Sequence, residues 1–150
     1  MPFDARRNGL ILGAGASAFI LEREELTTKR GILPYVKLIG AEILNSAFHG
    51  TRLDVDHVAE QVSSFTERMA KEVGSTPELI AHKTLFMSHE TYTPKRGGSA
   101  DAEIKALKKA FKSSASEVLI GNTKGFTGHP QGPDIENAVA IRGLVEGRIP

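Results

Sequence analysis

Two histidines, each preceded by a short apolar segment and set among small or hydroxyl residues, are the side chains best suited to catalysis. His89 lies in the sequence SHETYTP and His129 in NTKGFTGHP, which also contains Lys124. Imidazole N–H groups donate hydrogen bonds, and an ammonium group adds positive charge. The three side chains could therefore converge on one carbonyl oxygen and stabilise negative charge there. His49, His57 and His82 have no comparable setting and are assigned no role.

The segments around these residues alternate between strands and helices. Thr84 to Ser88 predicts a strand that ends at His89, and Val118 to Asn122 predicts one that leads to Lys124. Periodic apolar residues and end signals predict helices over Glu22–Arg30, Val55–Val73, Asp101–Phe111 and Pro133–Glu146. Two further strands, Leu10–Leu21 and Tyr35–Ile43, are expected to pair, and Pro77–Lys83 is expected to be a linker. The order favours an α/β sheet, in which functional groups gather at the carboxyl ends of parallel strands.

The composition is that of an ordinary single domain. The 150 residues are 40% hydrophobic and 25% charged, with a formal net charge of +1. No global charge selects nucleic acid or an anionic membrane surface. The chain has no cysteine, so neither a disulfide framework nor a thiolate metal site is expected. The polar start MPFDARR does not predict a signal peptide, and no apolar run predicts a membrane span, so a cytoplasmic protein is expected.

Three motifs in their order resemble the β-ketoacyl synthase (ketosynthase) domain of fatty acid and polyketide synthases, within the thiolase-like superfamily. PFDARRNGLILGAGASAFILE is similar to that family's PFDxxRDGFVLGEGAGxLVLE, SHETYTP to its HGTSTP, and NTKGFTGHPQG to its STKSMTGHxxG. The resemblance extends from Pro2 to Pro150. It implies an α/β chain with a partial thiolase-like fold, in which mixed sheets are covered by helices.

The same resemblance implies a role for each candidate residue. His89 and His129 would donate hydrogen bonds to the enolate that forms when a malonyl-type thioester loses carbon dioxide. Lys124 would orient the site and keep it electropositive, with Glu103 as its acidic partner. Thr91 and Thr93 would bind the amides of the phosphopantetheine arm. The substrate would be a phosphopantetheine thioester on an acyl carrier protein, and neither a metal nor a bound redox cofactor is implied.

The resemblance also implies that residues 1–150 are only part of a ketosynthase domain. The family's nucleophilic cysteine lies upstream of its PFD motif, and its GFGGTN loop would lie downstream of Pro150. We therefore expect the end of the first half and most of the second half of the fold. The remainder of a synthase polypeptide would complete it, and the complete domain would be a homodimer.

Some residues depart from the family's pattern. Glu90 and Tyr92 replace the glycine and serine of HGTST, the loop Lys95 to Asp101 is longer than the family's turn, and GPDIENA replaces a glycine-rich GAAGA. These changes fit a divergent polyketide-type synthase. They also fit a non-catalytic thiolase-like module with a structural or dimerisation role, which is the alternative function.

A weaker pattern points to nucleotide binding. Gly13, Gly15 and Ala18 spell GxGxxA after an apolar segment, and Glu42 ends a following predicted strand. However, no amphipathic helix is predicted directly after Gly15, and the same letters match the ketosynthase strand motif.

Overall fold

The structure is a computed structural model that describes residues 4, 6, 9–48, 52–92, 98–130 and 134–149. Its centre is a pair of short parallel strands, β1 (Leu85–Met87) and β2 (Leu119–Gly121), aligned with Leu85 opposite Leu119. The helix α4 (Ser99–Phe111) and the 3-10 segment η2 (Lys112–Glu117) connect the two strands. A parallel pair needs such a crossover, so these elements form a β-α-β unit. The predicted α/β class is confirmed; within the described residues it is represented by this one sheet.

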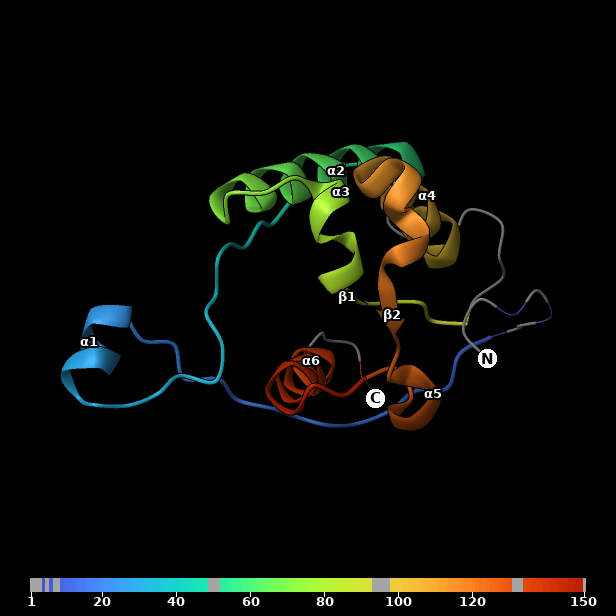
Figure 1. Cartoon of the computed structure of the whole chain (residues 1–150). Helices are drawn as coiled ribbons and strands as arrows, with labels where there is room; N and C mark the ends of the chain where they lie inside the picture. The colour runs from blue at the N-terminus through green and yellow to red at the C-terminus, as the bar shows by residue number, and fades with distance from the viewer. Residues whose placement is uncertain are drawn as a thin grey trace.

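Helices cover both sides of the strand pair (Figure 1). On one side lie α2 (Val55–Glu72), α3 (Pro77–Ile80) and α4, and on the other lie α5 (Lys124–Thr127) and α6 (Asp134–Glu146). Buried alanines on α4 let α2 pack closely against it: Ala102, Ala106 and Ala110. The core continues beside them through Ala81, Leu107, Phe111 and Val118. The helices α2 and α4 were both predicted from apolar spacing. None of the described helices has the length and hydropathy to cross a membrane.

Two predicted strands are not strands in this structure. Residues 10–21 and 35–43 have no regular secondary structure apart from a bridge at Leu12, and they form no ladder with each other. The short helix α1 (Glu24–Lys29) lies between them, away from the strand pair (Figure 1). Their apolar side chains face solvent, with Ile20 92% and Ile43 99% exposed. A strand needs a neighbour along its length to pair its backbone hydrogen bonds. Within the described residues, the first segment has only one isolated bridge, between Leu12 and His129, and the second belongs to no strand or bridge.

The predicted linker Pro77–Lys83 is also wrong, because it forms α3 and the 3-10 helix η1 (Ala81–Lys83). Thr76 caps α3 by accepting a hydrogen bond from the Leu79 N–H, and Pro77 occupies the start of the helix. These are ordinary helix-start signals.

The nucleotide-binding pattern at Gly13, Gly15 and Ala18 is not followed by a helix. Residues 15–23 contain none, so the GxGxxA pattern lacks the helix N-terminus that would hold a pyrophosphate.

One point of the N-terminal extended segment is firmly attached to the rest of the chain. Leu12 forms an isolated parallel bridge with His129. The Gly13 N–H donates to the His129 carbonyl at 3.1 Å, and the His129 N–H donates to the Ile11 carbonyl at 2.7 Å. A side chain at Gly13 would not fit, because its Cβ would lie 2.0 Å from the Thr127 carbonyl oxygen. This contact fixes the backbone of His129 at the edge of the site.

Candidate active site

The structure brings His89, Lys124 and His129 together at the carboxyl ends of the two strands. His89 follows β1, while Lys124 and His129 stand at and just beyond α5, which follows β2. The two imidazole rings meet edge to face, with centroids 5.3 Å apart and planes at 84°. The Lys124 ammonium lies 3.4 Å from Nδ1 of His89. These are the three side chains that the sequence predicted would converge.

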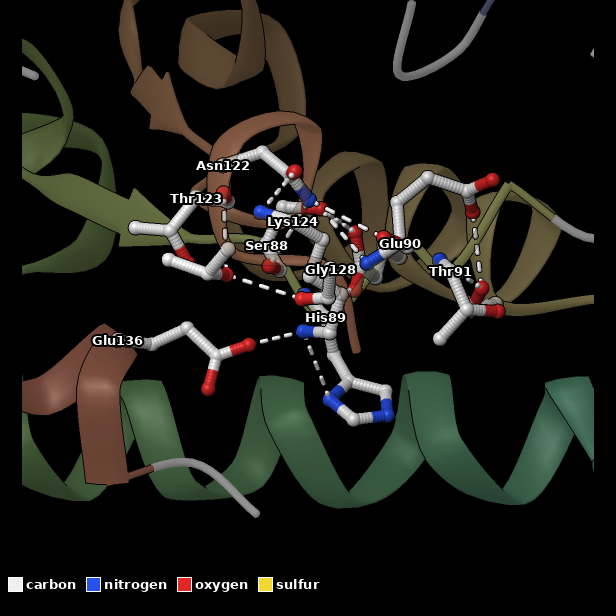
Figure 2. A network of polar contacts seen from close by, with 12 residues as sticks. Ser88, His89, Glu90, Thr91, Asn122, Thr123, Lys124, Gly128 and Glu136 are labelled. Atoms are coloured by element: carbon white, nitrogen blue, oxygen red, sulfur yellow. Dashed lines mark hydrogen bonds and ion pairs between the residues drawn. The ribbon is translucent and has the colours of Figure 1, made fainter. Parts of the chain in front are cut away.

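The ammonium of Lys124 is buried and forms an ion pair with Glu136 of α6 (Figure 2). The two side chains are only 1% and 6% exposed. The backbone N–H of Lys124 donates to the side-chain oxygen of Asn122 at 3.0 Å. The amide of Asn122 in turn donates to the carbonyls of Ser88 and Glu90, at 3.2 and 3.1 Å. Asn122 therefore joins the loop that carries Lys124 to the loop that carries His89.

Glu103 does not pair with Lys124 as predicted. Its carboxylate accepts a hydrogen bond from the Ser88 hydroxyl at 2.5 Å and one from the backbone N–H of His89 at 2.6 Å. Burial raises the pKa of the Glu103 carboxyl above its usual value, while these two hydrogen bonds act in the opposite direction. Glu103 thus positions the backbone of His89 from α4, and the acid that meets the ammonium comes from α6.

Of the two predicted arm-binding residues, Thr91 is buried in the loop after His89. Its backbone N–H donates to the Ser99 hydroxyl at 3.3 Å. Thr93 lies outside the described residues, as do residues 95–97 of the predicted loop Lys95 to Asp101. The last three residues of that loop belong to α4 instead. Of the two threonines, the structure therefore places Thr91 alone, in the loop that follows His89.

The surroundings of His89 favour its neutral form. Burial is the largest cause that lowers the pKa of its imidazole, followed by the positive charge of Lys124 and the neighbouring His129. Glu136 and Glu90 oppose this effect without cancelling it. Because an ammonium can only donate hydrogen bonds, Nδ1 of His89 is the acceptor in its contact with Lys124. The proton of the neutral ring is then on Nε2, where it is available as a hydrogen-bond donor.

Similarity to known proteins covers almost the whole chain. It is 30% identical over 152 aligned positions to 3-oxoacyl-(acyl-carrier-protein) synthase 2 of Coxiella burnetii, which accounts for 99% of this chain and 34% of that protein. It is 26% identical to the tetracenomycin polyketide synthase ketoacyl synthase alpha subunit of Streptomyces glaucescens, and that match covers 99% of this chain and 34% of the subunit. No family model matches.

A solved structure gives the same result for the fold. A chain in a complex described as a type II polyketide synthase acyl-carrier protein with its ketosynthase, bound to the hexaketide, superposes with a TM-score of 0.78. It is 25% identical, and the match covers 96% of this chain and 34% of that one. The predicted resemblance to β-ketoacyl synthases is confirmed. The ketosynthase-like chain spans about a third of the length of the relatives it matches.

The sequence did not predict three residues of the site in this ketosynthase-like chain: Glu136, Asn122 and Ser88. Glu136 stands in GPDIENA, a segment interpreted only as a departure from the family's glycine-rich pattern. Its signal was an acid on the apolar final helix, where a buried charge needs a partner. Asn122 and Ser88 each end a predicted strand, and side chains at such ends can bond neighbouring loops.

We expect the His89 ring to titrate below its ordinary value of 6.5, since burial and Lys124 disfavour the imidazolium. Lys124→Met should raise that pKa, because it removes a positive charge and leaves the Glu136 carboxylate facing the ring. Lys83→Met, at an exposed position of η1, is the control and should leave it unchanged. The chemical shifts of the His89 ring, followed by NMR against pH, measure this pKa in the wild type and in each variant.

The same pKa has a consequence for stability. Between the folded and unfolded pKa values the unfolded chain binds more protons at His89 than the folded chain does. The contribution of His89 to stability is therefore complete above about pH 6.5 and is lost as the pH falls through the folded pKa. An NMR midpoint at or above 6.5 in the wild-type protein would contradict this account of the site.

Proposed function

We propose that the chain is the histidine-bearing portion of a ketosynthase that joins acyl and malonyl thioesters by decarboxylative Claisen condensation, in cytoplasmic fatty acid or polyketide biosynthesis. The observation that carries the proposal is the convergence of two imidazole rings, 5.3 Å apart, with a buried ammonium beside one of them. Below, "complete ketosynthase" means this chain together with the remainder of such a domain.

The first step of the proposed reaction places charge where the histidines can stabilise it. When the malonyl thioester loses carbon dioxide, the electrons of the broken C–C bond form an enolate, whose charge lies largely on the thioester oxygen. Nε2–H of His89 and an N–H of His129 donate to that oxygen. Because Lys124 is paired with Glu136, it orients His89 and adds positive charge without having to exchange a proton.

The second step needs a group that this chain does not contain. The enolate carbon attacks the carbonyl of an acyl group held as a thioester on cysteine, the new C–C bond forms, and the C–S bond breaks with its electrons on the thiolate. The chain has no cysteine, so the remainder of the synthase supplies the nucleophile. An activated thiolate is the leaving group and is regenerated for the next acyl chain.

The partners in this proposal are an acyl carrier protein and the remainder of the synthase, in a homodimer. Thr91 and Thr93 bind the phosphopantetheine arm that delivers the malonyl group. The match to a ketosynthase solved with its acyl-carrier protein supports this assignment. The exposed apolar residues of segments 10–21 and 35–43 support a larger assembly, because such surface is normally covered by another part of a protein.

The function is tested with the complete ketosynthase, supplied with acyl and malonyl carrier-protein thioesters. We expect release of carbon dioxide and a β-ketoacyl product, detected by mass spectrometry. A protein that binds carrier protein and dimerises but releases no carbon dioxide would instead be the non-catalytic module considered above.

The 150-residue chain by itself is expected to form no condensation product, because without a thiolate no acyl-enzyme can form. The measurement is the same mass-spectrometric assay, with the complete ketosynthase as positive control. A β-ketoacyl product from the isolated chain would show that the reaction does not depend on a cysteine of the remaining domain.

A further inference from the structure

Two departures from the family's motifs meet in the structure. Glu90 replaces the glycine that follows the histidine in the similar motif, and Ser99 belongs to the lengthened segment Lys95 to Asp101, where it is the first residue of α4. The Glu90 side chain does not point toward solvent beside His89, since its residue is 0% exposed. Its Oε2 accepts a hydrogen bond from the Ser99 hydroxyl at 2.8 Å. We call this pair the Glu90–Ser99 latch.

The latch holds the backbone of the two residues that follow Glu90. Oε1 of Glu90 accepts from the Tyr92 N–H at 3.0 Å, and the Ser99 hydroxyl oxygen accepts from the Thr91 N–H at 3.3 Å. Tyr92 has a φ of 63°, in the left-handed region that a bulky side chain rarely adopts. The surrounding hydrogen bonds must therefore stabilise this turn, and the buried carboxylate supplies one of them.

Tyr92 carries the effect of the latch to the opposite loop. Its hydroxyl lies against Gly125, the residue after Lys124, so closely that a Cβ at Gly125 would be 2.7 Å from the Tyr92 oxygen. The next atom of the tyrosine, Cζ, would be 3.9 Å away. The turn set by Glu90 thus packs an aromatic side chain on α5, which connects Lys124 to His129.

We propose that Glu90 and Ser99 are positioning residues, which hold Thr91 and Tyr92 in one conformation and thereby fix α5 against the loop of His89. Glu90 is not a catalytic residue, because it is buried and its two oxygens accept hydrogen bonds from Tyr92 and Ser99. The catalytic consequence rests on the proposed ketosynthase function, whereas the structural consequence does not. The two departures in sequence compensate each other, since a carboxylate at position 90 needs the hydroxyl at position 99.

The first test compares Glu90→Ala, Ser99→Ala and the double variant in the complete ketosynthase. Each single variant should lower kcat/KM for malonyl decarboxylation about tenfold, as expected for the loss of a hydrogen bond to a charged group. The double variant should lose little more than either single one, because both break the same contact. Glu90→Gln keeps an acceptor for Tyr92 and should recover most of the activity. Glu60→Ala and Ser64→Ala, at exposed positions of α2, are the matched controls and should leave kcat/KM for decarboxylation unchanged.

Hydrogen exchange separates the latch from the function. The amides of Thr91 and Tyr92 should exchange faster in Glu90→Ala and Ser99→Ala than in the wild type or the α2 controls. This readout needs no ketosynthase activity, so a wild type without activity would refute the proposed function and leave the latch testable. Unchanged exchange at both amides, or losses of activity that simply add in the double variant, would overturn the latch.

A suppressor pair tests the contact between Tyr92 and α5. Gly125→Ala should lower decarboxylation, because its Cβ meets the Tyr92 oxygen at 2.7 Å. Tyr92→Phe in the same protein should restore it, because the nearest ring carbon is then 3.9 Å away. Recovery supports the proposal. A Gly125→Ala variant with wild-type activity, or one that Tyr92→Phe fails to improve, contradicts it.

Discussion

In the complete ketosynthase, His129→Ala is expected to cut malonyl decarboxylation about a hundredfold or more, the usual effect of removing one donor to a developing oxyanion. The backbone of His129 is fixed by its two hydrogen bonds to Ile11 and Gly13, and these do not involve the imidazole. The variant should therefore keep its fold and lose the N–H that stabilises the enolate. Release of carbon dioxide from malonyl carrier protein measures the effect.

Acyl loading provides the internal control for this prediction. Transfer of an acyl group to cysteine depends on the thiolate more than on the enolate donors, so it should fall less than decarboxylation does. His82→Ala, at an exposed histidine of η1, should affect neither step. Decarboxylation by His129→Ala within a factor of two of wild type would remove His129 from the reaction and favour the non-catalytic module.

The sequence predicted those parts of the fold whose signals are local. The apolar spacing of α4 and the short apolar runs of β1 and β2 identify the β-α-β unit that carries the site. Because both histidines follow strands of one parallel pair, their convergence could also be predicted. Alternation over residues 35–43, however, shows only that they could fit a sheet, and whether a neighbour is present depends on other parts of the fold.

The acidic residues of the site were harder to predict, because their partners are distant in sequence. Glu103 and Glu136 both lie on helices that could face Lys124, and only the packing of α6 decides that Glu136 meets the ammonium. From the sequence, Glu90 is only a departure from the family's glycine after His89, but in the structure its carboxylate accepts a hydrogen bond from Ser99 on α4. A sequence pattern shows that a buried charge needs a partner; it does not show which partner the fold supplies.

The ion pair between Lys124 and Glu136 leads to the second large expected effect. Either Lys124→Met or Glu136→Leu should destabilise the complete ketosynthase by about 3–5 kcal/mol, because each leaves a buried charge without its partner. The Lys124 ammonium donates to Oε1 of Glu136, and Oε2 has no hydrogen-bond partner within the described residues, so the carboxylate depends strongly on Lys124. Urea unfolding midpoints, compared at equal slope, measure the loss.

The double variant Lys124→Met/Glu136→Leu distinguishes a structural ion pair from a catalytic one. It removes both buried charges together, so most of the stability should return, whereas decarboxylation should stay impaired because His89 has lost the ammonium 3.4 Å from its Nδ1. Lys109→Met/Glu60→Leu is the matched control: that pair is 42% and 61% exposed, and its removal should cost about 1 kcal/mol or less. A double variant with wild-type activity would assign Lys124 to folding alone. A double variant that is no more stable than the single variants would mean that the two charges do not compensate each other. The ammonium beside His89 would then need another source of stabilisation.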